Sequence, residues 1–220
     1  MKTSKITIAL IIIFLLNIQL LTGCFSSGES LPYYTLSKEF ADYCWFEADN
    51  YWIYQNDSTL ATDSVKITEV EEAKRFNPQG IDYNYQAVDM YMKTNVFGFS
   101  RHELTAGDYE AAANEMNSLL RLYKDDGTYY LVFSPKYAIG EEIDLGAGVG
   151  LYTNLEIIES LELNGNTYTN VYHTQIIMES GSGTEYNYWI AKNYSIVKSV
   201  ITSNGQTISI SLKSANLTTH

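Results

Sequence analysis

The side chains that could carry out chemistry in this chain are few and scattered. Of the three histidines, only His102 stands beside a carboxylate, that of Glu103. Neighbouring residues of a strand point to opposite faces, so this pair is poorly placed to act as acid and base on one substrate. No spacing of histidine or cysteine matches a zinc site. The sequence therefore predicts neither a metal ion nor a catalytic histidine.

Three short glycine-containing stretches match parts of known motifs without completing them. Ser100 follows Gly98-Phe99 but lacks the second glycine of a nucleophile elbow. The run from Gly146 to Gly150 is not followed by the lysine of a phosphate-binding loop. Asp125-Asp126-Gly127 lacks the other ligands of a calcium loop and fits a hairpin turn. We expect no cofactor and no enzymatic activity; a glycan hydrolase built on paired carboxylates is the enzymatic alternative.

The N-terminal segment carries a more specific pattern. Lys2 and Lys5 precede the apolar stretch 6–16, which is typical of a secretory signal peptide. Leu21-Thr22-Gly23-Cys24 follows and resembles a bacterial lipobox. The resemblance implies cleavage between Gly23 and Cys24, and attachment of fatty acyl chains such as palmitate to Cys24.

Two other interpretations of this segment compete with the lipobox. Residues 6–28 carry no charge and are long enough for an uncleaved membrane-spanning helix, which needs about 20 residues. Gly23, Gly28 and the polar residues from Asn17 onward argue against it. A buried core cysteine at position 24 is disfavoured by its small, polar neighbours.

The resemblance also implies a location and a domain order. Phe25 follows the modified cysteine, and the absence of aspartate there favours the outer membrane of a Gram-negative envelope. We expect a cleaved signal peptide over residues 1–23, a lipidated tether over 24–36 and a single β-rich domain over 37–220. The membrane is thus the predicted partner, through Cys24. A net charge of −12 disfavours nucleic acid.

The composition of the domain favours strands. Tyrosine occurs 19 times and proline only three times, and tyrosine suits a half-buried pleated surface. Once Cys24 is lipidated, Cys44 has no disulfide partner, and its aromatic neighbours predict a small buried hydrophobe.

Most of the domain is predicted to consist of strands joined by short turns. Strands are expected over 43–54 (in two pieces around Asp49-Asn50), 64–70, 81–95, 97–104, 119–123, 128–133, 155–163, 167–178, 186–191, 195–202 and 207–213. Residues 71–80 and 134–150 are predicted loops. Residues 108–117 carry apolar side chains at helical spacing, with Asp108 as a possible cap, and predict a short helix. The fold class is mainly β: a curved antiparallel sheet or half-barrel, LolA-like or lipocalin-like.

Two stretches add a resemblance to this fold. Asn50-Tyr51-Trp52-Ile53-Tyr54, with Asp63-Ser64-Val65, resembles the first hairpin of a group of uncharacterised bacterial lipoproteins. Tyr188-Trp189-Ile190-Ala191-Lys192-Asn193, followed by Ile196-Val197-Lys198, resembles a signature near their C-termini, shared with LolA-like carriers. Those proteins usually have glycine where this chain has Asp49 and Ser195. The resemblance implies an antiparallel half-barrel and carries no activity.

The strand over 81–95 supplies the candidate binding residues. Apolar side chains occur at both alternating sets of positions, which predicts that the strand is covered on both sides or lines a cavity. We expect Tyr83, Tyr85, Tyr91 and Met92 to line a cavity for a hydrophobic ligand, so that the domain is a non-enzymatic binding module. The alternative is an accessory or surface subunit that docks another envelope protein or a glycan. Trp45, Trp52 and Trp189 are predicted core residues, with a sugar-binding platform as the alternative.

Overall fold

The chain from Tyr33 onward is one β-rich unit. The computed structural model describes residues 31–77, 83–93, 98–110, 115–146, 149–179 and 183–218. The apolar side chains of its core all lie between Leu36 and Leu217, within this unit. A segment that contains its own core is able to fold by itself. The tether predicted over residues 24–36 therefore overlaps the folded unit at its end.

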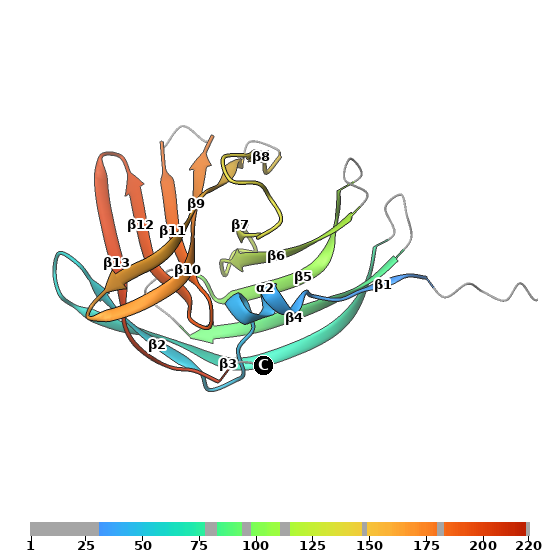
Figure 1. The fold of residues 1–220 in the computed structure, drawn as a ribbon, viewed down its shortest axis with the longest axis horizontal. Helices are drawn as coiled ribbons and strands as arrows, with labels where there is room; N and C mark the ends of the chain where they lie inside the picture. Colours follow the sequence, from blue (N-terminus) through green and yellow to red (C-terminus); the bar gives the residue numbers. More distant parts are fainter. Residues whose placement is uncertain are drawn as a thin grey trace, which may run out of the picture. The chain divides into compact units, whose positions relative to one another are not determined.

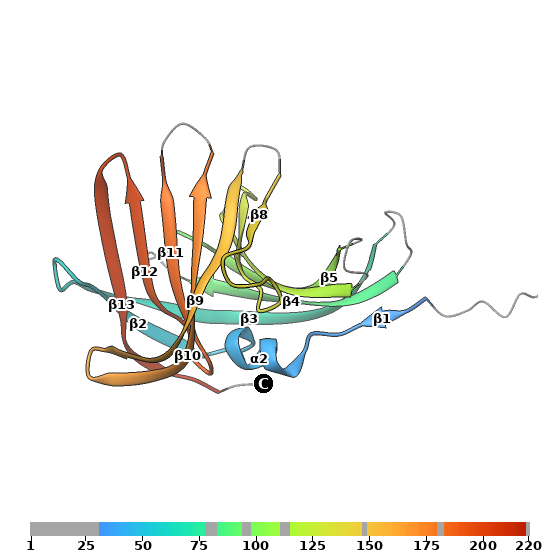
Figure 2. The ribbon, with the colours of Figure 1, turned by 45° about the horizontal axis from the view of Figure 1, so that its top comes forward.

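The unit is built on one antiparallel sheet. Its strands among the described residues are β1 (Tyr33–Tyr34), β2 (Tyr51–Asn56), β3 (Thr62–Asn77), β4 (Tyr83–Lys93), β5 (Arg101–Glu110), β6 (Glu115–Tyr123), β7 (Tyr129–Phe133), β8 (Glu142–Asp144), β9 (Gly150–Leu163), β10 (Asn166–Met178), β11 (Glu185–Ala191), β12 (Ser195–Ser203) and β13 (Gln206–Asn216). Their order is β7-β6-β5-β4-β3-β2-β13-β12-β11-β10-β9-β8, and β1 pairs parallel with β4. In both views β11, β12 and β13 run steeply across the direction of β3 and β4 (Figures 1 and 2).

The sheet is curved and open, which confirms the predicted fold class. β7 and β8 stand at the two ends of the strand order, so no ladder joins them into a barrel. Side chains link the two halves instead: the Thr174 hydroxyl of β10 donates to the Val132 carbonyl of β7 at 2.8 Å. The likeness to LolA-like carriers stays a prediction.

A short helix, α2 (Lys38–Cys44), covers the apolar face of the sheet. The Ser37 side chain caps it by accepting a hydrogen bond from the Phe40 backbone N–H at 3.2 Å. Phe40 stacks on Phe133 of β7 at 5.8 Å between ring centroids, and Tyr43 meets Tyr172 of β10 edge to face at 5.5 Å. The helix thereby joins the two halves of the sheet around one core.

Turn chemistry explains the hairpins of the second half. The predicted turns at Asn164-Gly165 and Asn204-Gly205 are confirmed, with φ between 50° and 78° at all four residues. Asparagine and glycine tolerate this left-handed region, which two-residue hairpin turns require. Asp49 and Ser195 also have positive φ, 69° and 61°, at the two places where the similar lipoproteins usually have glycine.

Three predicted elements are wrong. The helix predicted over 108–117 is absent from the described part of that range, because 108–110 belong to β5 and 115–117 to β6. Asp108 pairs with Asn117, and this cross-strand pairing outweighs the helical spacing of the apolar residues. The first of the two short strands expected within 43–54 is also wrong, because Tyr43 and Cys44 end α2.

The third error is the loop predicted over 71–80, as far as its described residues 71–77 are concerned, since 78–80 lie outside the described residues. β3 continues to Asn77 because its polar residues pair along β4, with Glu71 opposite Asp89 and Arg75 opposite Tyr85. The loop predicted over 134–150 likewise contains a short strand, β8.

Candidate ligand-binding site

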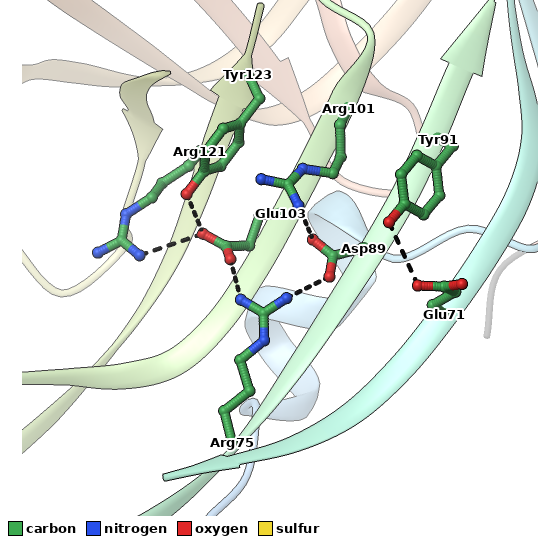
Figure 3. Close-up of polar contacts among 8 residues, drawn as sticks. All are labelled: Glu71, Arg75, Asp89, Tyr91, Arg101, Glu103, Arg121 and Tyr123. Atoms are coloured by element: carbon green, nitrogen blue, oxygen red, sulfur yellow. Dashed lines mark hydrogen bonds and ion pairs between the residues drawn. The ribbon is translucent and has the colours of Figure 1, made fainter. Parts of the chain in front are cut away.

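All three arginines of the chain converge on one face of β3 to β6. Arg75 lies on β3, Arg101 on β5 and Arg121 on β6. The sheet register places two carboxylates between them, because Asp89 of β4 stands opposite Glu103 of β5, and Glu103 stands opposite Arg121. Figure 3 shows these side chains in front of the sheet and the helix behind it. We call these five residues the arginine cluster.

Direct contacts hold the arginine cluster together. The Arg75 guanidinium bridges the two carboxylates through Asp89 Oδ2 and Glu103 Oε1 (Figure 3). Arg101 Nη1 lies 3.4 Å from Asp89 Oδ1, and Arg121 Nη1 lies 3.3 Å from Glu103 Oε2. The Tyr123 hydroxyl donates to Glu103 Oε2 at 2.9 Å. Glu103 is thus a shared acceptor for two arginines and a tyrosine.

The two carboxylates respond differently to this environment. Burial raises the pKa of Asp89, although Arg75 and Arg101 oppose the shift. Burial also opposes ionisation of Glu103, but the Tyr123 hydroxyl and the adjacent arginines outweigh it and lower the pKa of that carboxyl. Burial, followed by the nearby Glu103 carboxylate, raises the pKa of Tyr123 to about 12, so its hydroxyl remains a donor at neutral pH.

A pocket of about 500 Å³ opens beside the arginine cluster. Its lining residues come from β6, β7, the turn between them, β8 and the segments on either side of β8: Leu119, Arg121, Gly127, Thr128, Tyr129, Leu131, Tyr137, Ile143, Asp144, Leu145, Gly146 and Val149. Ligand pockets of this size, apolar with a few polar groups, are typical of small-molecule sites. Arg121 belongs both to this pocket and to the arginine cluster.

Buried hydrogen bonds fix the wall of the pocket that contains Tyr137. The Asn154 side-chain amide donates to the carbonyls of Ser134 and Tyr137, each at 2.8 Å. The Asn154 backbone carbonyl accepts from the Gly140 N–H at 2.8 Å. The Tyr152 hydroxyl accepts from the Ser134 N–H at 3.1 Å. The wall is therefore anchored to β9 without a ligand, and the pocket is largely pre-formed.

A second, smaller pocket of about 240 Å³ lies on the other side of the arginine cluster. Tyr91, Ser100, Arg101, Tyr123, Lys124, Asp125 and Gly127 line it. The Arg101 guanidinium lies 3.9 Å from the centroid of the Tyr123 ring. The Arg101 guanidinium and the Tyr123 ring therefore cover one face of each other. The small pocket beside them is lined mainly by polar side chains.

The structure separates the four residues predicted to form a cavity. Tyr83, Tyr85 and Tyr91 share the face of the arginine cluster, and Met92 is buried on the opposite face. Tyr83 is fully buried and contacts Tyr85, with 5.9 Å between ring centroids. Tyr91 lines the smaller pocket, and the larger pocket is lined by other residues. One sequence feature could have pointed to the larger pocket: Ile143, Leu145 and Val149 are apolar residues in a segment predicted to be a loop.

The other sequence candidates take structural roles. His102 lies on the apolar face, opposite in direction to Glu103 as predicted, and burial lowers its pKa to about 3. Cys44 is buried, and burial raises the pKa of its thiol. Asp126 accepts from the Thr128 N–H at 2.8 Å and closes the predicted hairpin turn. Cys24, Gly23 and His220 lie outside the described residues.

The three tryptophans differ in burial. Trp45 and Trp52 are buried in the core, as predicted. Trp189 is partly buried, and its ring stacks on His173 at 4.2 Å with Lys198 5.0 Å from its centroid. His173 and Lys198 contact its ring system, which disfavours a platform for a sugar.

The described residues contain neither a metal-binding cluster nor a membrane-spanning helix. Among the described residues, no group of three His, Cys, Asp or Glu side chains is placed to hold a metal ion. No helix in the same part of the chain has the length and apolar character needed to cross a membrane.

Comparison with known proteins yields a weak structural likeness. No protein-family model matches the chain, and no curated protein matches it. A crystal structure of a presumed lipoprotein from Parabacteroides distasonis is similar with a TM-score of 0.43 and 11% sequence identity. The match covers 79% of this chain and 99% of that one.

Proposed function

We propose that this protein is a lipid-anchored protein of the bacterial outer membrane that binds a small hydrophobic ligand. The observation that carries the binding role is the pocket of about 500 Å³ between β6, β7, β8 and the described residues that flank β8. Leu119, Leu131, Ile143, Leu145 and Val149 give this pocket an apolar lining that a hydrophobic molecule can contact. Burial of a ligand there stabilises the complex by about 25 cal/mol for each Å² of apolar surface removed from water.

Attachment to the membrane rests on the lipobox at Leu21-Thr22-Gly23-Cys24. Two or three acyl chains on Cys24 would hold the protein firmly, since each buried CH₂ contributes about 0.8 kcal/mol. The matching experiment is fractionation of cells that express the Cys24→Ser variant. The variant should leave the membrane fraction, and its retention there would contradict the anchor.

The burial and pairing of the two carboxylates in the arginine cluster favour a binding role over a catalytic one. The side chains of Asp89 and Glu103 are only 6% and 4% exposed and already pair with arginines. A general acid or base must reach the substrate directly or through one water. Both carboxylates are poorly placed for that, so we assign them to positioning the arginines.

The pocket is tested by blocking it. The chain from Ser26 onward is titrated with 1-octanol by calorimetry, alongside Val149→Trp and Ile157→Trp. Val149 lines the pocket, whereas Ile157 is an exposed residue of β9 outside the lining. Both variants replace a β-branched residue by tryptophan, so they differ only in whether the indole lies at the pocket.

The expected result is octanol binding to the unmodified chain and to Ile157→Trp. Val149→Trp should weaken it at least about tenfold, because the indole occupies space that the ligand needs. Circular dichroism checks that each variant is folded. Equal binding by a folded Val149→Trp protein, or no binding by the unmodified chain, would refute the proposal.

A further inference from the structure

Two aromatic side chains beside β1 form an exposed patch. Tyr33 of β1 and Phe76 of β3 both pair with Asn84 of β4, one from each side, so their rings share one face of the sheet. Tyr33 is 46% exposed and Phe76 is 49% exposed. The Lys74 ammonium group lies 5.2 Å from the centroid of the Tyr33 ring. We call Tyr33, Lys74 and Phe76 the β1 patch.

Hydrogen bonds fix the strand that carries Tyr33. β1 pairs with β4 at Asn84 and Tyr85. Just after β1, the Leu36 backbone N–H donates to Gln86 Oε1 at 3.0 Å, and the Gln86 side-chain amide donates to Glu72 Oε1 at 2.7 Å. The β1 patch is therefore held in place by the sheet, and little conformational entropy is lost when a partner covers it.

The chemistry of the β1 patch matches the surface of a lipid bilayer. Exposed apolar groups that gather in one place mark interaction sites. Tyrosine is enriched at membrane–water interfaces, because its ring is apolar and its hydroxyl stays wet, and lysine keeps its ammonium group in water above an apolar stem. Glu72 and Lys74 lie on the same face of β3 and have opposite charges. The patch therefore adds no net charge against phosphate head groups, although the whole chain carries −12.

The proposed lipid anchor brings a bilayer next to the β1 patch. Tyr33 lies nine residues after Cys24, and a chain of that length spans at most about 30 Å when fully extended. Acyl chains on Cys24 would hold Tyr33 within that distance of the membrane. A short tether turns a weak contact into an intramolecular one, with an effective concentration on the order of millimolar.

We propose that the β1 patch rests on the lipid bilayer, with the rings of Tyr33 and Phe76 among the head groups. This inference rests on the lipid anchor of the proposed function and adds the face of the folded unit that meets the membrane. In both views the turn between β12 and β13 lies at the opposite end from β1 (Figures 1 and 2). Ile208, close to that turn in the sequence, is therefore expected to stay in water.

Quenching of tryptophan fluorescence by brominated lipid tests this contact, because bromine quenches only indoles that lie close to it. The full chain with its lipid anchor is placed in phosphatidylcholine vesicles, with or without bromine on the acyl chains near the head group. Phe76→Trp puts a reporter in the β1 patch, and Ile208→Trp puts one at a residue that is 51% exposed. Flotation of the vesicles measures the anchor separately, and circular dichroism checks the fold.

Phe76→Trp should lose most of its added fluorescence in brominated vesicles, and Ile208→Trp should keep its own. Tyr33→Trp is a second reporter in the patch and should be quenched like Phe76→Trp. Adding Tyr33→Glu to Phe76→Trp should remove most of the quenching, because a carboxylate is costly to take out of water.

The inference would be overturned if both patch reporters stay unquenched in chains that float with the vesicles. That result would leave the anchor standing and favour a protein partner for the patch. Equal quenching of Ile208→Trp would also overturn the inference, since the contact would not be specific to this end. A chain that does not float with the vesicles would refute the lipid anchor and the contact together.

Discussion

Replacement of Glu103 by glutamine tests whether the arginine cluster stabilises the sheet. Glu103 is 4% exposed, and its loss of charge leaves Arg75 and Arg121 beside a neutral amide. Removal of one partner from a buried ion pair costs about 3 to 5 kcal/mol. Arg75 is 33% exposed and Arg121 18%, so water partly solvates both after the change. We therefore expect the lower end, a loss of about 3 kcal/mol in the free energy of unfolding.

Urea unfolding, followed by tryptophan fluorescence, measures this loss in the chain from Ser26 onward. For a domain of this size, about 3 kcal/mol corresponds to a fall in Tm of roughly 6 to 12 °C. Glu71→Gln is the matched control, because Glu71 is exposed on the same face and accepts a hydrogen bond from the Tyr91 hydroxyl at 3.3 Å. It should change the stability by less than about 0.5 kcal/mol. Equal effects of the two substitutions would refute the reasoning.

Three further predictions concern pH and backbone strain. The stability lost in Glu103→Gln should shrink as pH falls below about 4.5, the ordinary pKa of glutamate. The pKa of Glu103 is lowered in the folded state, so its carboxylate stabilises the fold fully above pH 4.5, and this stabilisation is lost as pH falls through the folded-state pKa. Urea unfolding between pH 7 and about pH 3 measures the change. Gly150→Ala should lower the free energy of unfolding by about 3 kcal/mol, because an added Cβ would lie 2.2 Å from the Ile177 carbonyl oxygen. Gly127→Ala is the control: it has a positive φ but open space around it, and should lower the free energy of unfolding by about 1 kcal/mol in the same assay. Ser195→Gly should raise the free energy of unfolding by about 1 kcal/mol, since Ser195 has a φ of 61°; a loss of stability would show that the serine is not strained.

The elements that local chemistry determines were predictable from the sequence. The hairpins at Asn164-Gly165 and Asn204-Gly205 followed from turn residues between alternating strands, and both are present. The helix α2 was missed because its seven residues include Phe40, Tyr43 and Cys44, whose types favour a strand. Packing of Phe40 and Tyr43 against β7 and β10 decides the conformation there, and that packing is not local in sequence.

The arginine cluster was beyond sequence reasoning for a similar reason. Arg75, Arg101 and Arg121 are far apart in the chain, and they meet only through the register of four strands. Local reasoning did predict that His102 and Glu103 face opposite ways, because alternation along a strand needs no knowledge of its neighbours. The sequence predicts a loop over the polar part of β3, because the pairing with β4 that makes it a strand is not visible in the sequence.

Native mass spectrometry of the chain from Ser26 onward tests the central claim most directly. The protein is expressed in the cell envelope, purified without denaturation, and compared with Val149→Trp. We predict a reproducible adduct of lipid mass on the unmodified chain and a loss of that adduct in the variant. A bare polypeptide mass, or an adduct that persists in folded Val149→Trp, would contradict a ligand in this pocket.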